Sequence, residues 1–355
     1  MTNFPILKDS ILKYTSNMKS EDLLAAVKRN PFLLAPMAGV TDVAFRSYMV
    51  EMGCGVVISE LVSAKGIQYE SAKTLNLLRM SETERPVGIQ VFGEDLESLH
   101  EAAKVIEGRG ADFIDLNFGC PVPKVVKKGA GSAVLKDLVQ LGKVVHAVKS
   151  GTKLPVTIKV RTGWDHDSKN SLEVAKVAFN EGATWMAMHG RTRSQAYKGF
   201  ADWGYISEVA KESPLPVIGN GDLVSPELCV SRLKESGCFA VMIGRGCLKN
   251  PWIFKQSKAL LMGEKPVKRD YLFSVDRLKY HLEKYYEGKK LMIQLKKLSA
   301  WQSAGFSGSA QFRRNVFRAE SYDEICGIVE EFFEPLQNVV QEDTSHEDFL
   351  MGGHG

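Results

Sequence analysis

The sequence predicts an α/β protein in which a (β/α)8 TIM barrel is followed by a C-terminal helical domain. Eight short apolar runs recur from residue 32 onward, amphipathic stretches lie between most of them, and only helix-like patterns follow residue 254. The length of 355 residues fits a barrel of about 220 residues with an appended domain.

The apolar runs have the character of strands that are buried on both faces, because they are nearly continuous instead of alternating with polar residues. The eight runs are FLLAPM (32–37), GVVIS (55–59), PVGIQVF (86–92), DFIDLN (112–117), PVTIKV (155–160), WMAMHG (185–190), PVIGNG (216–221) and FAVMIG (239–244). Eight such strands joined by helical crossovers match a closed barrel.

The stretches between the runs predict helices over 95–108, 138–149, 170–181, 203–212 and 225–236. Proline near the start of the last stretch suits a first helical turn. An open, doubly wound sheet has the same local pattern. No G-x-G-x-x-G follows the first strand, which counts against a dinucleotide-binding domain of that kind.

The segments on either side of the barrel, at residues 32–254, differ in character. A polar, helix-compatible leader covers residues 1–31, and a helical domain is expected over 255–341. Gly305 and Gly308 interrupt the helical pattern of that domain. Its expected helices are 255–263, 271–288, 290–303 and 322–340, and the acidic tail at 342–355 is expected to be disordered.

Composition excludes several other classes of protein. Hydrophobic residues make up 44% and charged residues 25%, which are globular values and not those of a disordered chain. The N-terminus has no apolar signal region, and no apolar run approaches the roughly 20 residues that cross a bilayer. None of the six cysteines forms a C-x-x-C pair or a zinc-like spacing with histidine. We therefore expect reduced thiols, no metal, no membrane contact and a cytoplasmic location.

The net charge of +4 is unevenly distributed along the chain. Residues 255–320 carry 15 Lys and Arg against 6 Asp and Glu, whereas residues 321–355 carry none against 9. A segment with a net charge of +9 can contact a polyanion. The same charges also fit solvated helix faces.

Polar residues stand at the ends of the predicted strands, which meet at one mouth of a barrel. Folding stability alone does not explain so many of them. They are Pro36-Met37-Ala38, Ser59-Glu60, Gln90, Asn117 with Cys120, Lys159 with Arg161, His189 with Arg191, Asn220-Gly221-Asp222 and Gly244-Arg245.

Several of these residues suit an anionic, heterocyclic ligand. Lys159 lies in an apolar strand, so its charge requires a partner, either an anionic cofactor or a structural ion pair. Gln90 can hydrogen-bond a heterocycle edge or satisfy backbone groups. Gly221 and Gly244 follow the last two strands, where barrels often bind phosphate, although each alone also fits an ordinary turn. Arg245 can add a paired contact to such a phosphate.

Cys120 lies in a tight loop between Gly119 and Pro121, at the end of the fourth strand. A thiol at the barrel mouth can act as a nucleophile or as a general acid or base, although a lone cysteine is more often inert. His189 has no second histidine or carboxylate at ligand spacing, so we expect it to hydrogen-bond a cofactor or substrate.

Taken together, these motifs resemble the dihydrouridine synthase family, the flavin enzymes that reduce uridines in tRNA, and in particular its bacterial B-type branch. Coverage runs from about 32 to 254 and continues more loosely through 292–313. The matching motifs are LAPMAGVTDVAFR (34–46), GIQVFG (88–93), DLNFGCPVPKVVKKGAGSAVL (115–135), PVTIKVRTGWD (155–165), HGRTRSQAYKG (189–199), PVIGNGD (216–222) and VMIGRGCLKNPWIF (241–254).

The resemblance implies a barrel that binds FMN and a C-terminal helical region that grips tRNA. The residues it implies for the cofactor are Pro36, Met37, Ala38, Gln90, Lys159, His189, Asn220, Gly221, Asp222, Gly244 and Arg245. For RNA, the candidates are Asn117, Lys124, Arg161, Arg191, Lys296, Lys297, Arg313 and Arg314, with Lys127 and Lys128 beside Lys124.

The resemblance also implies the chemistry, in which Cys120 protonates carbon 5 of uracil while reduced FMN delivers a hydride to carbon 6. NADPH would reduce the flavin again, and the protein is expected to act as a monomer. Two alternatives stay open. An FMN barrel acting on a free small molecule, of the dihydroorotate dehydrogenase or ene-reductase type, leaves the basic segment unexplained. An RNA-binding module with a degenerate barrel predicts a colourless protein, whereas bound FMN makes it yellow.

Overall fold

The computed structural model describes residues 17–336 and has a closed barrel of parallel strands at its centre. The neighbouring strands run in the order β1-β9-β8-β7-β6-β5-β4-β2. Backbone hydrogen bonds of 3.0 Å, from Leu34 N–H to the Val56 carbonyl and from Gly55 N–H to the Phe32 carbonyl, join β1 to the start of β2 and complete the ring. The strands are β1 (Phe32–Leu34), β2 (Val57–Ile58), β4 (Val87–Phe92), β5 (Phe113–Phe118), β6 (Val156–Arg161), β7 (Met186–His189), β8 (Val217–Asn220) and β9 (Ala240–Ile243).

The predicted TIM barrel is thus confirmed, and each of the eight apolar runs corresponds to one strand, with β5 and β6 ending one residue beyond their runs. The short β3 (Val62–Ser63), which pairs with β4, was not predicted. The strands are almost entirely buried, because side chains fill the barrel on one face and helices cover the other.

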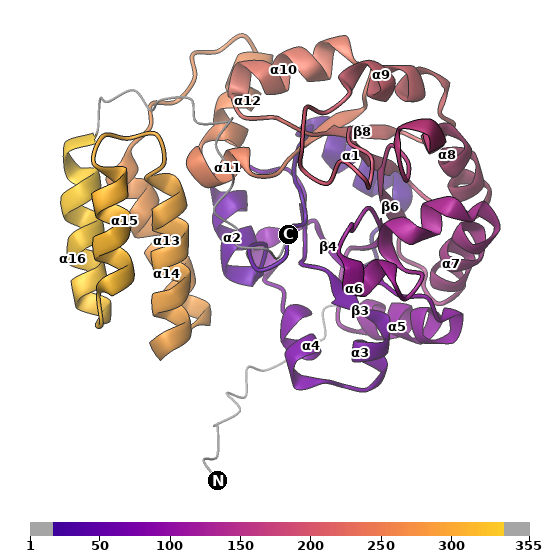
Figure 1. Cartoon of the computed structure of the whole chain (residues 1–355), viewed down its shortest axis with the longest axis horizontal. Coiled ribbons are helices and arrows are strands. Elements are labelled where there is room, and N and C mark those ends of the chain that lie inside the picture. The colour runs from indigo at the N-terminus through magenta and orange to yellow at the C-terminus, as the bar shows by residue number, and fades with distance from the viewer. Residues whose placement is uncertain (1–16, 337–355) are drawn as a thin grey trace.

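Helices surround the barrel (Figure 1), and the five that were predicted between the strands are present within a residue of the expected bounds. A side-chain oxygen from Asp95, Asp137, Asp202 or Ser225 accepts a backbone N–H at the start of four of them, which is typical N-capping. These helices are α5 (Leu96–Gly108), α7 (Leu138–Ser150), α8 (Ser171–Asn180), α9 (Trp203–Glu212) and α10 (Pro226–Glu235).

Shorter elements complete the barrel and supply the loops of its mouth. They include α2 (Val43–Glu51), α3 (Ala64–Gln68), α4 (Ala72–Leu77), α6 (Pro123–Val126) and α11 (Gly246–Lys249), together with the 3-10 turns η1 (Glu82–Glu84), η2 (Gly131–Lys136) and η3 (His166–Ser168). The sequence pattern indicated none of these elements. Most are too short to show an amphipathic repeat, and α2 is buried on nearly every side, so it has no polar face.

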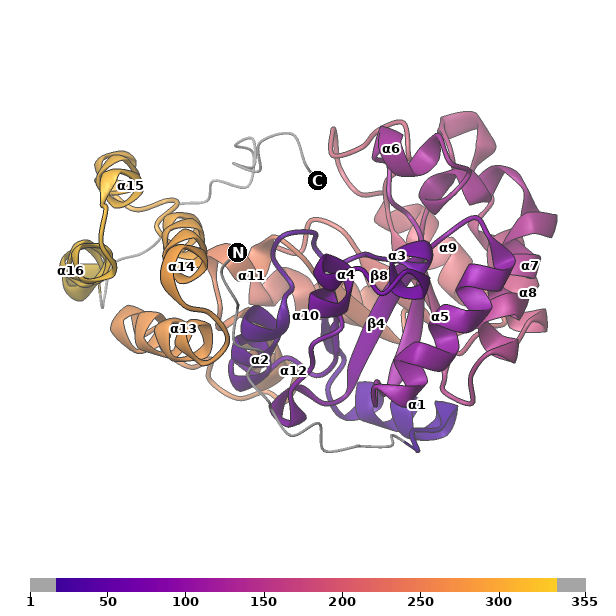
Figure 2. The ribbon, with the colours of Figure 1, turned by 90° about the horizontal axis from the view of Figure 1, so that it is seen from below.

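The end of the barrel opposite the mouth is covered by α1 (Ser20–Arg29), which Figure 2 shows on the far side from α6. Leu23 and Val27 of this helix are fully buried in a small core with Phe113 and Trp185. The described part of the leader therefore packs against the barrel. Helix α12 (Ile253–Leu261) packs on α10 and β1, so the domain boundary expected after residue 254 falls inside this helix.

Four helices form a bundle at one side of the barrel, next to α2 (Figure 1). They are α13 (Tyr271–Tyr285), α14 (Gly288–Gln302), α15 (Ser309–Arg318) and α16 (Tyr322–Phe333), followed by the 3-10 turn η4 (Glu334–Leu336). The sequence pattern missed α15 because glycines precede it. Gly305 and Gly308 have φ angles of +85° and +78°, and Gly308 directly precedes the helix. The acidic tail at 342–355 lies outside the described residues.

None of the helices within residues 17–336 has the length and apolar character required to span a bilayer. The same residues contain no group of three or more His, Cys, Asp or Glu side chains placed to hold a metal ion. All six cysteines are free thiols: Cys54, Cys120, Cys229, Cys238, Cys247 and Cys326.

Candidate functional site at the barrel mouth

The carboxyl ends of the strands bring many of the predicted site residues together. Gln90 of β4 and Asn117 of β5 share a hydrogen bond of 2.8 Å, in which the Asn117 amide donates to Gln90 Oε1. On the next strand, β6, Lys159 donates to Asn220 Oδ1 of β8 at 3.1 Å, past the intervening β7. Residues more than 60 positions apart in the chain therefore meet at one surface, as the barrel prediction required.

A continuous chain of hydrogen bonds leads from the barrel wall to Cys120. Thr157 Oγ1 and Gln90 Nε2 donate to the two oxygens of Asp115 at 2.6 and 2.7 Å. Gln90 Oε1 then accepts from Asn117 Nδ2, and Asn117 Oδ1 accepts the backbone N–H of Cys120 at 2.8 Å. Because a carboxylate only accepts hydrogen bonds, Asp115 fixes which way both amides point.

Asp115 is fully buried, and this burial raises the pKa of its carboxyl to about 6, although the hydrogen bonds from Gln90 and Thr157 lower it. Sequence reasoning missed Asp115 and Thr157. A signal was present, since Asp115 is a carboxylate within an apolar run and stands two residues before Asn117, on the same side of the strand.

The Cys120 thiol is half-buried in the loop that follows β5. The Cys120 carbonyl accepts hydrogen bonds from both the backbone N–H and the hydroxyl of Ser132, at 3.1 and 2.8 Å. Gly131 lies so close that a Cβ there would stand 3.2 Å from the Cys120 Cβ. Burial raises the pKa of the Cys120 thiol, so the group is a protonated acid at neutral pH.

The part of the mouth formed by β6 and β7, next to β5, is strongly cationic. Lys159 has no carboxylate within ion-pairing distance among the residues that the structure describes, and burial and then Arg161 lower its pKa to about 8. Burial, with Arg161 and Lys159 nearby, lowers the pKa of His189 well below its usual range. The imidazole is therefore neutral and able to accept a hydrogen bond.

Two further arginines are buried and hold the mouth loops in place. Arg161 donates to the carbonyls of Gly119, Thr192 and Ala196 at 2.6–2.9 Å. Arg191 pairs with Asp222 at 2.8 Å and also donates to the Gly199 carbonyl at 2.6 Å. Both guanidinium groups thus connect loops that follow different strands.

Tyr197 lies between two cations of the mouth. Sequence reasoning did not single out this tyrosine. The guanidinium carbons of Arg161 and Arg245 stand 5.6 and 5.4 Å from the centre of its ring. These distances are typical of cation–π contacts, and Tyr197 is 47% exposed. Arg245 itself is partly exposed at the start of α11.

The turn after β8 has a conformation that suits glycine. Gly221 has a φ of +132°, and a Cβ there would lie 2.5 Å from the Ala201 side chain. Asp222, with a φ of +52°, accepts the backbone N–H of Ala201 at 2.7 Å. By contrast, a Cβ on Gly244 would meet only ordinary contacts, with Ala35 at 3.7 Å and Met37 at 3.9 Å. Gly244 therefore lies within ordinary packing distance of the residues at the end of β1.

The loop between β1 and α2 carries Pro36, Met37 and Ala38, which are partly or fully exposed. Thr41 closes this loop, because its hydroxyl accepts the Met37 N–H at 3.0 Å and its own N–H donates to the Met37 carbonyl at 3.0 Å. The three residues thus lie at the mouth, above β1.

The predicted RNA contacts outside the barrel wall have different surroundings. Lys124 on α6 is exposed, as are Lys127 and Lys128. Lys296 donates to the carbonyl of Ala319 at 2.5 Å, at the end of α15. Arg313 and Arg314 lie on α15, where Arg314 is exposed and donates to Gln311.

A comparison with solved structures agrees with the TIM-barrel fold. A solved structure of histamine dehydrogenase from Rhizobium sp. 4-9 aligns with a TM-score of 0.51 and 14% identity, over 71% of this chain and 49% of that chain. This chain thus spans about half of that protein, and the likeness shows a shared fold.

The sequence comparisons define the family. The profile of the dihydrouridine synthase (Dus) family matches residues 33–339. A tRNA-dihydrouridine synthase B of Pseudomonas putida is 37% identical over 322 residues, covering 89% of this chain and 95% of the relative. A probable tRNA-dihydrouridine synthase of Rickettsia conorii is 38% identical over 289 residues, covering 80% and 87%. The chain therefore belongs to the dihydrouridine synthase family.

Proposed function

We propose that this protein reduces specific uridines in tRNA to 5,6-dihydrouridine, with FMN as its cofactor and NADPH as the reductant of the flavin. The observation that carries the proposal is the position of Cys120, whose backbone N–H donates to Asn117 Oδ1 at the mouth of a barrel from this family. The names of the relatives agree with this activity.

The residues of the mouth fit a flavin with a phosphate group. Lys159 is a half-buried cation whose hydrogen bond, within the described part of the chain, goes to a neutral amide oxygen, so an electron-rich ring edge would complete its surroundings. Gln90 retains one N–H of its amide for the same edge. The groups proposed for the ribityl phosphate are Asn220, Gly221, Asp222, Gly244 and Arg245, with His189 near the ring and Pro36, Met37 and Ala38 contacting it from β1.

The bound cofactor supplies the hydride that adds to carbon 6 of the uracil, which no amino-acid side chain can provide. The chain supplies the proton, which passes from Cys120 Sγ to carbon 5, so that one hydride and one proton saturate the double bond. Asn117 sets the position of the Cys120 backbone. Arg161 and Arg191 hold the surrounding loops and are proposed to shape the pocket for the base.

Entry of the target base requires it to leave its stack in the RNA, at a cost of a few kcal/mol, about that of other base-modifying enzymes. Phosphate contacts offset this cost. We assign them to Lys124 and its exposed neighbours on one side of the mouth, and to the basic bundle helices with Arg313 and Arg314 on the other side. In this division the barrel unit extends through α12, and the tRNA-binding unit starts at α13.

The proposal is tested by mapping dihydrouridine in total RNA from cells with and without this protein. We expect specific tRNA positions to lose dihydrouridine, and the purified protein to be yellow with absorbance near ~450 nm. A yellow protein whose absence leaves every dihydrouridine in place would instead favour a flavin barrel that acts on a free small molecule. A colourless protein would favour an RNA-binding module.

A further inference from the structure

Gly39, in the loop between β1 and α2, is held by side chains from the barrel and from the bundle at once. Its N–H donates to Oε1 of Glu60, which follows β2, and its carbonyl accepts from Lys297 Nζ of α14 at 2.6 Å. Gly39 has a φ of +74°, a conformation that other residues rarely adopt. Both peptide groups of a single glycine are therefore bound from two different parts of the molecule.

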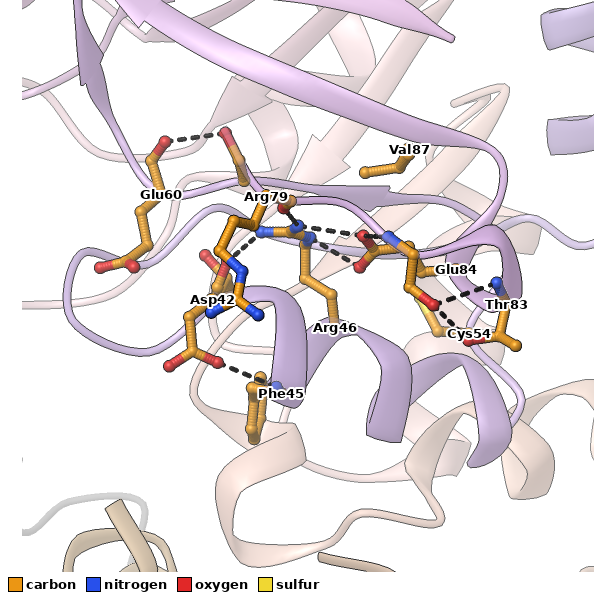
Figure 3. A network of polar contacts seen from close by, with 12 residues as sticks. Asp42, Phe45, Arg46, Cys54, Glu60, Arg79, Thr83, Glu84 and Val87 are labelled. Atoms are coloured by element: carbon orange, nitrogen blue, oxygen red, sulfur yellow. Dashed lines mark hydrogen bonds and ion pairs between the residues drawn. The ribbon is translucent and has the colours of Figure 1, made fainter. Parts of the chain in front are cut away.

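The α2 end of this loop is fixed by a separate network, which Figure 3 shows beneath Glu60. Asp42 caps α2 by accepting the Phe45 N–H at 3.0 Å. Arg46 donates to the Thr41 carbonyl at 2.8 Å and forms a fully buried ion pair with Glu84 at 2.9 Å. The start of α2 is thus held by several contacts, whereas Gly39 stands just outside this network.

The charged groups around Lys297 also show that it lies between the bundle and the loop that follows β1. Burial lowers the pKa of Lys297, and the charges of Asp42 and Glu60 oppose this shift. Gln294, one turn earlier on α14, donates to Asp42 at 3.0 Å, so the same helix face contacts the loop twice. Lys297 is therefore bound by the loop carbonyl and lies in the field of two nearby carboxylates.

We propose that Glu60 and Lys297 are positioning residues that hold Gly39, and through it the Pro36–Ala38 segment, in the conformation that retains the flavin. The bundle then contributes to cofactor affinity as well as to RNA binding. This inference rests on the proposed flavin site, and it gives Lys297 a role other than the phosphate contact that the sequence suggested.

The test measures how fast flavin leaves the purified holoenzyme on dilution, followed by the rise in flavin fluorescence. Lys297→Met removes the donor but keeps the aliphatic stem, and we expect flavin release to be faster by about tenfold, because the charge-assisted hydrogen bond to the Gly39 carbonyl is lost. Lys297→Arg should restore slow release. Lys289→Met removes the same charge from an exposed position on α14 and should leave release unchanged.

Two further variants keep the test decisive if Lys297→Met folds poorly. Glu60→Gln retains an oxygen acceptor for the Gly39 N–H, whereas Glu60→Leu removes it, so only the leucine variant should release flavin faster. Gly39→Ala strains the left-handed backbone without a steric clash, because no atom lies within 4 Å of the added Cβ. It should also release flavin faster.

The salt dependence of tRNA binding separates the competing roles of Lys297. If Lys297→Met released flavin at the wild-type rate, and the slope of log tRNA affinity against log salt became smaller, Lys297 would be a phosphate contact. That result would overturn the proposal. Equal rates of flavin release from Glu60→Leu and Glu60→Gln would also overturn the proposal. If the wild-type protein held no flavin, the proposed function itself would be wrong, a result distinct from either outcome.

Discussion

At the scale of single residues, the chemistry of the mouth depends on which atoms accept hydrogen bonds. Asp115 accepts hydrogen bonds from both Thr157 and Gln90. This orients the Gln90 amide, which in turn orients the Asn117 amide that accepts the Cys120 N–H. The thiol is therefore placed by a carboxylate that does not contact it. Such an arrangement makes the position of Cys120 sensitive to groups several bonds away.

Substitution of Cys120 by alanine tests the proposed acid directly. We expect dihydrouridine formation to fall by about 10²–10⁴-fold, the usual contribution of a general acid. Reduction of the flavin by NADPH should stay at the wild-type rate, because the thiol has no part in that half-reaction. Single-turnover measurement with tRNA checks the first expectation, and loss of flavin colour under NADPH checks the second. Retention of full activity would exclude the acid role.

The pH profile tests Asp115, whose pKa is raised to about 6. As the pH falls through about 6, protonation weakens the acceptor that orients Gln90, so the rate should fall. Stability should change in the opposite direction. The folded state binds this proton more tightly than the unfolded chain does. The contribution of Asp115 to the free energy of unfolding therefore increases as the pH falls from about 6 toward 3.8. In Asp115→Asn, which cannot titrate, the acid limb of the rate profile should disappear.

At the scale of elements, the mouth is built by short helices and turns rather than by the long helices of the barrel wall. Helix α6 has only four residues, yet it presents an exposed lysine, and two more lysines follow its end. The turn η2 returns the chain so that Ser132 can bind the Cys120 carbonyl. These elements therefore connect the proposed acid to the proposed RNA surface.

Replacing Lys124, Lys127 and Lys128 together by alanine should weaken tRNA binding mainly at low salt. Removing one lysine–phosphate interaction should reduce the slope of log affinity against log salt by about 0.7–0.9. A control variant with alanine at Lys143, Lys176 and Lys211 changes the net charge equally, at exposed positions on α7, α8 and α9. An equal decrease of the slope in both variants would indicate a general charge effect and not a site beside Cys120.

At the scale of the whole molecule, the barrel and the bundle share a polar junction around α2 and α13. The hydroxyl of fully buried Tyr48 is 2.6 Å from Ser274 Oγ, and it accepts from Gln302 at 3.3 Å. Glu51 binds both Arg277 and His281, at 2.5 and 2.7 Å. The junction is thus fixed by directional contacts, which set the orientation of the bundle relative to the mouth.

Tyr48→Phe removes the hydroxyl at the centre of this junction and leaves Ser274 and Gln302 without that partner. We expect the unfolding free energy to fall by about 1–3 kcal/mol, the usual cost of an unsatisfied buried polar group. Thermal or urea unfolding measures the change. Tyr280→Phe is the matched control, since Tyr280 lies half-exposed on α13 and its hydroxyl should contribute little.

Much of this architecture follows from local patterns in the chain. The eight apolar runs predict the strands because a strand covered on both faces requires continuous apolar sequence. The polar residues at their ends, from Gln90 to Arg245, predict the mouth because parallel strands of a barrel end on one side. The family motifs around Cys120 are likewise local, so the sequence by itself determined the fold class and most of the candidate site.

Only the tertiary structure decided how those residues are connected. Lys297 and Gly39 are 258 positions apart, and no local pattern relates an α14 lysine to a loop that follows β1. Asp115 acquires its role only when Gln90 and Thr157 from the neighbouring strands contact it. Hydrogen bonds and burial depend on atoms that distant segments bring together. The hydrophobic periodicity of a segment indicates only its own secondary structure and which of its faces is buried.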